Sequence, residues 1–394
     1  MRQYGGRGGV GNIWIHGRTP PRYRCTVCQK TFGARAGTLF HRRSTDEATI
    51  TYVLTLLAHG CPPAAIEAAF GVQRQTVRTW QDAAGSQSEA VHRHLVCQPR
   101  DLGAVQADEI RVRQQGGIVW LAMAMVVTTR LWLGGAVSPR RDGTLIARLC
   151  VLVKACALPA PLLVLVDGFA AYLTQVHRMA RSPLPRDGKR GRCRLVEWPG
   201  LVIGQVVKQR EAGRVVGVTR RLAHGTARRA VRLLGGGTIQ TAYIERLNGT
   251  FRARLTALAR RTRASGRTGV RLEAGMWLVG TLNNFCTPHG SLRAGETPAM
   301  AAGITDHCWR VDEPAARPAP SCGVATAEEV GKANENGGGA HRALGGMTTV
   351  PHTPTDEWNR LPDRIELVLG SRSRGGFTFP CERVQAFVHS PGPP

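Results

Sequence analysis

The sequence predicts an α/β protein with a small all-helical domain in front of its core. The core is indicated by a continuously apolar run at residues 162–166, typical of a parallel strand buried on both faces. Apolar residues at helical spacing after residue 44 predict the helical domain. From residue 313 Pro, Gly, Ala and Ser dominate, and these bury little apolar surface. We therefore expect four regions: a cysteine-bearing segment at 1–43, helices at 44–95, the core at 100–312 and a disordered tail at 313–394.

Charge indicates the kind of partner. The 394 residues include 53 Lys plus Arg against 27 Asp plus Glu, a formal net charge of +26. Such a surplus favours a polyanion, usually a nucleic acid, because each basic contact releases condensed counterions. An Arg-rich genome is the alternative explanation.

The place of the protein in the cell follows from cysteine usage and hydropathy. The 11 cysteines lack the regular spacing of a secreted disulfide framework. Residues 1–11 are rich in Gly and Arg rather than apolar, and the longest apolar stretch, 117–127, is too short to span a bilayer. We expect a cytoplasmic protein without a membrane segment.

Three short helices are predicted between residues 44 and 82. Ser44 and Glu47 have the spacing of a capping box, and Gly71 marks the turn before the third helix. The third helix, residues 73–81, leaves three polar side chains outward: Arg74, Gln75 and Arg78. Arg and Gln can pair with guanine and adenine edges, so the pattern predicts a DNA-binding helix-turn-helix. An ordinary three-helix bundle with a solvated basic face is the alternative.

A cysteine pair precedes these helices. Cys25 and Cys28 have the two-residue gap that presents two thiolates to zinc. One pair supplies only two of four ligands, and His16 and His41 are the nearby residues that could complete the set. The spacing alone leaves open a zinc site or a simple buried pair.

Two aspartates mark the core. Residues 105–113 alternate as a strand does, so that Asp108 shares a face with Ile110 and Val112, while Glu109 is expected in solvent or against basic neighbours. Asp167 ends the apolar run, where open α/β sheets place ligands. Between them lie strands at 117–128 and 131–138 and a helix at 144–156. This order is that of the ribonuclease H-like fold, in which the first and fourth strands are neighbours, so Asp108 and Asp167 could share a metal.

A third acid is predicted on a helix. Glu245, Asn248 and Arg252 lie at i, i+3 and i+7, beside an apolar stripe at helical spacing. Phosphodiester chemistry needs an activated nucleophile and a stabilised leaving oxygen, which two Mg²⁺ ions supply, and Mn²⁺ could replace them. Hard divalent ions take oxygen ligands, so we expect Asp108, Asp167 and Glu245 to hold them. Asn248 and Arg252 are then expected to orient a carboxylate or contact DNA phosphate. A solvated basic helix with an incidental Glu is the alternative.

These residues resemble the DDE transposases of bacterial insertion sequences, especially the branch with an N-terminal zinc-finger-like segment and a helix-turn-helix. The likeness covers roughly residues 11–310. The similar segments are Tyr23–Phe32, the predicted helices up to Trp80, Gln106–Ile110, Val166–Gly168, Glu245–Asn248, Asn283–Leu292 and Thr297–Ala299. The upstream second CxxC pair usual in the family is missing here, and the Pro/Gly-rich end differs from it.

The resemblance implies an enzyme of DNA recombination. It would bind terminal repeats on double-stranded DNA, and cleave and transfer strands with Mg²⁺ in a homo-oligomer that holds both ends. Two alternatives stay open: a binding-only regulator or inactive decayed copy, and a different ribonuclease H-like nuclease such as a resolvase.

Overall fold

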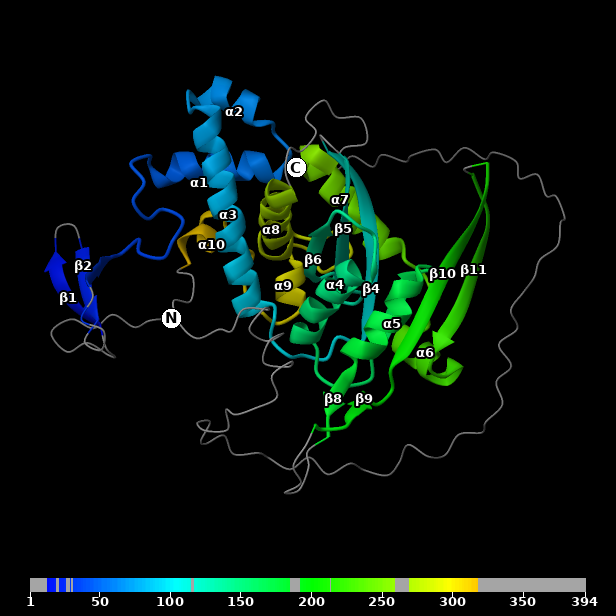
Figure 1. The fold of residues 1–394 in the computed structure, drawn as a ribbon. Helices are drawn as coiled ribbons and strands as arrows, with labels where there is room; N and C mark the ends of the chain where they lie inside the picture. The colour runs from blue at the N-terminus through cyan, green and yellow to red at the C-terminus, as the bar shows by residue number, and fades with distance from the viewer. Residues whose placement is uncertain are drawn as a thin grey trace, which may run out of the picture. The chain divides into compact units, whose positions relative to one another are not determined.

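The computed structural model describes residues 13–18, 21–25, 29, 31–114, 117–184, 192–212, 214–258 and 269–317. For residues 13–18, Pro21, Cys25 and Arg210 it describes the backbone alone. These residues form helices and a six-stranded mixed sheet (Figure 1), so the expected α/β class is confirmed. No helix in the described part of the chain is both long and apolar enough to cross a membrane.

The first described elements are a small sheet and three helices. The sheet is antiparallel and consists of β1 (Ile13–Arg18), β2 (Pro21–Cys25) and β3 (Thr31–Gly33). The helices are α1 (Glu47–Ala58), α2 (Pro63–Phe70) and α3 (Arg74–Leu95). Asp46, rather than the expected Ser44, caps α1, since its side chain accepts from the Thr49 amide at 2.8 Å. Gly71 ends α2 at φ +65°, and α3 continues well beyond the predicted end at residue 81.

The central sheet has the strand order β11-β10-β7-β4-β5-β6. Its strands are β4 (Ala104–Gln114), β5 (Gly117–Val126), β6 (Trp132–Ser138), β7 (Leu163–Asp167), β10 (Val202–Glu211) and β11 (Arg214–His224). Strands β4, β7 and β10 run parallel, and the other pairs are antiparallel. The strands that carry Asp108 and Asp167 are therefore neighbours, as the strand order predicted. A separate two-stranded sheet joins β8 (Arg181–Pro183) and β9 (Leu195–Glu197).

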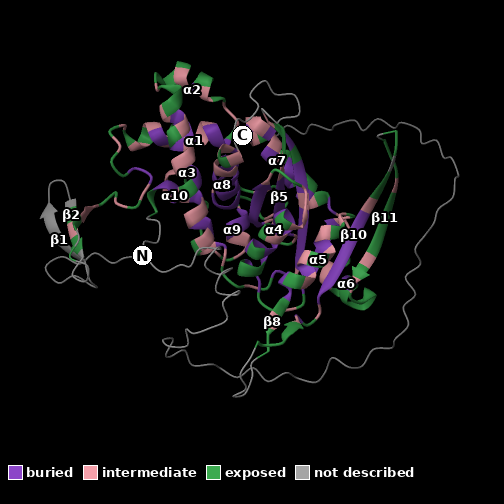
Figure 2. Ribbon diagram, in the orientation of Figure 1, coloured by how far each residue is buried: buried purple, intermediate pink, exposed green. Residues whose placement is uncertain are grey.

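Helices cover both faces of the sheet. They are α4 (Gly143–Cys156), α5 (Ala170–Met179), α6 (Ala227–Leu234), α7 (Ala242–Arg254), α8 (Gly269–Phe285), α9 (Pro298–Ala301) and α10 (Asp312–Ala316), with a 3₁₀ turn at Thr256–Leu258. Ile110 and Val112 of β4 pack in one cluster with α7 and α8, while Val105 and Ala107 pack in another with α4 and α5. Strand β4 is consequently buried on both faces, whereas most of β11 is exposed (Figure 2).

The three-helix region shares its core with the sheet. Helix α3 runs beside α8 (Figure 1), and Thr281 Oγ1 donates to the Ser88 carbonyl at 3.2 Å. A Cβ on Gly85 would lie 2.5 Å from the Ala274 backbone, so the two helices touch at a position that only glycine allows. One hydrophobic cluster joins residues of α1 to α3 with residues of β4 to β6, α7 and α8. The expected regions 44–95 and 100–312 therefore pack as one body.

The body extends into the start of the expected tail. Pro314 and Ala315 of α10 are buried, and the Leu39 amide donates to the Ala315 carbonyl at 3.0 Å. The expected tail boundary at 313 is therefore too early, because these small apolar residues pack against the helical region. The remainder of that segment, 318–394, lies outside the described residues.

Candidate metal centre

A pocket of about 770 Å³ opens beside β4, β7, β10 and the start of α7. All three predicted acids line it: Asp108, Asp167 and Glu245. Other polar residues of its wall are Glu109, Arg141, Lys208, Thr241, Asn248 and Arg252. We call this site the acid pocket.

Asp108 and Asp167 meet because β4 and β7 are parallel and adjacent. Their registered pairs end at Gln106 opposite Leu165, which brings the next carboxylates on the two strands to the same level. Asp108, Glu109 and Asp167 each offer an oxygen, and these oxygens lie within 4.8 Å of one another. Burial raises the pKa of Asp108 to about 7, and the neighbouring charges of Glu109, Asp167 and Glu245 add to that rise.

The burial of Glu109 differs from what the sequence predicted. It lies on the opposite face of β4 from Asp108, as alternation predicts, yet it is buried rather than in solvent. The reason is that α4 and α5 pack on that face of β4, whereas the opposite face, which carries Asp108, borders the acid pocket. Burial raises the pKa of Glu109, and Arg141 opposes this by donating to Glu109 Oε2 at 2.8 Å.

Arg141 joins two of the acids. Its Nη2 also donates to Asp167 Oδ2 at 2.7 Å, so one guanidinium bridges two carboxylates. Its side chain lies over the Phe169 ring at 4.3 Å from the ring centroid. Nothing in the spacing of the sequence singled out Arg141, because it follows β6 in a short connection before α4. Only the folded chain brings it to the pocket.

Glu245 reaches the pocket from the first turn of α7. Gln106 of β4 fixes the start of that helix: its Oε1 accepts from the Ile244 amide at 2.9 Å, and its Nε2 donates to the Gln240 carbonyl at 2.8 Å. Glu245 Oε1 accepts from Lys208 Nζ at 2.6 Å and from Thr241 Oγ1 at 2.9 Å. Glu245 is more exposed than Asp108 and Asp167, and its charge is paired with that of Lys208 on β10.

Asn248 and Arg252 follow Glu245 along the same wall. Asn248 is buried and its Nδ2 donates to Asp108 Oδ2 at 2.9 Å. The amide therefore orients Asp108, one of the two roles expected for it, while Arg252 lines the pocket farther along α7. Among the described residues, Asn248 Oδ1 and Glu109 Oε1 are buried without a hydrogen-bond partner.

The donor set fits a hard divalent cation. Carboxylate oxygens are the ligands that Mg²⁺ and Mn²⁺ prefer, and Asp108, Glu109 and Asp167 each offer one within 4.8 Å of the other two. Burial is the main cause of the raised pKa values of Asp108 and Glu109, with neighbouring negative charges adding to it, and a bound cation would relieve the cost of ionising them there.

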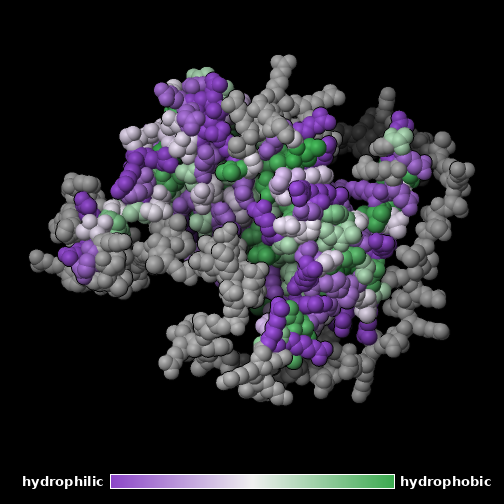
Figure 3. Space-filling view, in the orientation of Figure 1, coloured by the Kyte–Doolittle hydropathy of each residue, from purple (hydrophilic) through white to green (hydrophobic). Residues whose placement is uncertain are grey.

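The outward residues of α3 lie apart from this pocket. Hydrophilic side chains gather over α2 and the start of α3 (Figure 3), where Gln75 is exposed and Arg78 half-buried. Arg74 is held by an ion pair, since its Nη2 lies 2.6 Å from Glu67 Oε2 on α2. Of the three side chains expected to point outward, Arg74 and Gln75 are exposed and Arg78 is half-buried, and Arg74 is already engaged.

The predicted zinc ligands cannot be placed. Cys28 and the side chains of Cys25 and His16 lie outside the described residues. His41 is exposed, in the turn that precedes α1.

Comparisons with protein-family models and with curated proteins find no match for this chain. The chemistry of the acid pocket is therefore inferred from the side chains that line it.

Proposed function

We propose that this protein is a DNA transposase in which Asp108, Asp167 and Glu245 hold two divalent ions for strand cleavage and transfer. The observation that carries the proposal is that these three acids, far apart in the sequence, line one pocket. Asp108 and Glu109 have raised pKa values, so keeping them ionised in the fold lowers its stability. A purely structural role would give nothing in return for that loss. Functional sites commonly retain such a cost.

The strand order supports a ribonuclease H-like core. Three antiparallel strands, a helix and a parallel strand beside the first one occur in that sequence order, with Asp108 on the first strand and Asp167 on the fourth. When bound, Mg²⁺ would activate a water or a 3′-hydroxyl and stabilise the leaving oxygen. The chain's own part is to orient Asp108 through Asn248 and to surround a phosphate with the cations of Lys208, Arg252 and Arg141.

Helices α1 to α3 are proposed to read duplex DNA. The start of α3 presents Gln75 and Arg78 on a hydrophilic surface, and the net charge of +26 favours a polyanion. The protein would act as a homo-oligomer that holds both ends of its element, bound through terminal inverted repeats.

The test uses the DNA that flanks the gene. Inverted repeats found there are placed on a plasmid, and the full chain is assayed for cleavage with Mg²⁺ and with chelator. Asp108→Asn, Asp167→Asn and Glu245→Gln should each lower cleavage at least about 1,000-fold, because each removes an ionic metal ligand. DNA binding should stay within about threefold, and Glu211→Gln, an exposed acid outside the pocket, should cut normally.

Two outcomes would reject the proposal. Cleavage that survives in all three acid variants would mean that another site does the chemistry. A wild-type chain that binds its repeats but never cuts them would leave the binding-only regulator or decayed copy as the better description.

A further inference from the structure

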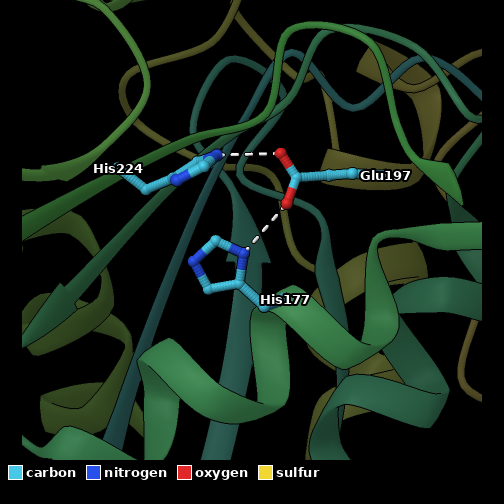
Figure 4. A group of neighbouring side chains, drawn as sticks. All are labelled: His177, Glu197 and His224. Carbon is cyan, nitrogen blue, oxygen red and sulfur yellow. Dashed lines mark hydrogen bonds and ion pairs between the residues drawn. The ribbon is translucent and has the colours of Figure 1, made fainter.

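Three more potential metal ligands meet away from the acid pocket. His177 lies in the last turn of α5, Glu197 ends β9, and His224 ends β11. His177 Nδ1 lies 3.0 Å from Glu197 Oε2, and His224 Nε2 lies 2.9 Å from Glu197 Oε1 (Figure 4). Each residue offers one ligand atom within 4.8 Å of the other two. We call this group the His–Glu–His cluster.

The cluster is more organised than a surface ion pair. Both carboxylate oxygens are occupied, each by a different imidazole, and the two rings pack edge to face with centroids 4.4 Å apart. Burial by itself raises the pKa of Glu197, but the hydrogen bonds from His177 and His224 outweigh it and lower that pKa. Glu197 therefore presents a charged carboxylate between two imidazoles at neutral pH.

The cluster is also far from the acid pocket within the sheet. His224 is registered with Ile203 at the start of β10, and β10 and β7 run parallel from Val202 opposite Leu163 to Val206 opposite Asp167. Asp167 thus lies at one end of this strand pair and His224 at the other. Helix α5 starts just after Asp167 and delivers His177 at its opposite end.

We propose that His177, Glu197 and His224 bind one divalent transition-metal ion of the Zn²⁺ class. Zinc takes imidazole nitrogens and carboxylate oxygens, often three protein ligands with water in the fourth position. Side-chain exposures of 30%, 34% and 32% for His177, Glu197 and His224 leave room for that water. Mg²⁺ prefers all-oxygen sites and is not favoured here.

The geometry needs little adjustment. Ligand atoms arranged tetrahedrally about 2.1 Å from zinc lie about 3.4 Å apart. The contacts of 3.0 and 2.9 Å end on different oxygens of Glu197, and the single atoms that the three residues offer lie within 4.8 Å of one another, so the carboxylate would turn one oxygen toward the ion as it binds. Coordination would join α5, the β8–β9 pair and the end of β11, three elements held here by hydrogen bonds. The ion would cross-link these elements with a water in its fourth position, and its presence does not depend on the proposed DNA chemistry.

The test titrates Co²⁺, a coloured stand-in for Zn²⁺, into the metal-free full chain with excess Mg²⁺ present to occupy oxygen-only sites. His177→Gln and His224→Gln should each remove one equivalent of Co²⁺ binding, or weaken it at least about 100-fold, because both change a direct ligand. His94→Gln, an exposed histidine outside the cluster, should leave the titration unchanged. Removal of both zinc-candidate cysteines, Cys25→Ser with Cys28→Ser, should spare the same equivalent.

A melting curve guards against variants that do not fold. Zn²⁺ should raise the melting temperature of the wild type and of His94→Gln, but not that of folded His177→Gln or His224→Gln. The proposal is overturned if the cluster variants bind as much Co²⁺ as the wild type. It is equally overturned if the wild type shows no equivalent beyond those of the cysteines, since the cluster is then only a hydrogen-bonded tie.

Discussion

The acid pocket and the His–Glu–His cluster lie at opposite ends of the same parallel strand pair, and they hold charge differently. In the pocket, Asp108 and Glu109 are pressed together away from water, and their pKa values rise. In the cluster, Glu197 sits between two imidazoles, and its pKa falls. The carboxylates of the pocket are ionised at a cost that comes mainly from burial, whereas Glu197 is already hydrogen-bonded by both of its partners.

This difference indicates different uses of a metal. Carboxylates that are buried beside one another gain most from a cation, because the ion neutralises charge that water no longer solvates. A carboxylate that both imidazoles satisfy gains only cross-linking from an ion. We therefore expect metal ions to take part in chemistry at the acid pocket and a metal ion to cross-link the chain at the His–Glu–His cluster.

Neutral substitutions of Asp108 and Glu197 should change the free energy of unfolding in opposite directions. The raised pKa of Asp108 means that its ionisation destabilises the fold as pH rises from about 4 to 7, and this cost stays in full above pH 7. Asp108→Asn should therefore raise the free energy of unfolding in chelator at pH 8, by up to about 4 kcal/mol, and have little effect at pH 4. Its hydrogen bond with Asn248 can persist.

Glu197→Gln should do the reverse. The lowered pKa of Glu197 gives stability that is present above its unfolded pKa and is lost as pH falls through its folded pKa. Because the side chain is a third exposed, solvent limits the loss to about 1 kcal/mol at pH 8. Urea unfolding measures both variants, with Glu211→Gln as the exposed control. If both variants shift stability the same way, the contrast between the two sites is wrong.

Arg141 is expected to stand in for a cation in the pocket. Arg141→Ala leaves Glu109 and Asp167 without the guanidinium that bridges them, which should cost about 1–3 kcal/mol in chelator. Millimolar Mg²⁺ should recover part of the loss, since it neutralises the same oxygens. Arg140→Ala, the exposed neighbour, should be silent. A loss that Mg²⁺ leaves unchanged would mean that Arg141 serves packing on Phe169 instead.

The sequence predicted the strands and the positions of Asp108 and Asp167 because both depend on local patterns, but the third acid that the structure brings within ligand distance of them is Glu109 rather than Glu245. Apolar alternation placed Asp108 on its face of β4, and a buried run ended at Asp167. The burial of Glu109 was missed, since alternation tells which face a residue takes but not whether helices cover that face. The one signal in the sequence was that Glu109 directly follows Asp108, a residue already predicted as a ligand.

Residues that come together only through tertiary structure were not predictable. Arg141 lies in a connection, Lys208 on the exposed part of β10, and His177 and His224 on elements whose pairing no spacing reveals. Helix α3 was predicted too short, because the buried stripe of its second half is made largely of small or polar residues and packs on α8; these residues are Ala84, Gly85, Ser88, Val91 and His92. Such contacts depend on the fold as a whole, so a single sequence carries little trace of them.

The smallest expected effect tests whether DNA reading is separate from both sites. Arg78 is half-buried on α3 and belongs to neither metal group, so Arg78→Ala should leave the free energy of unfolding within about 0.5 kcal/mol. If its guanidinium reads a base, affinity for the preferred repeat should fall by about 1 kcal/mol or more, while affinity for unrelated duplexes changes less. Competition binding at fixed salt measures the two affinities, and cleavage at saturating DNA should match the wild type.

Equal weakening on every sequence would make Arg78 a phosphate contact, because phosphate contacts carry no base information. A loss of cleavage at saturating DNA would instead tie α3 to the acid pocket, through the core that the two regions share.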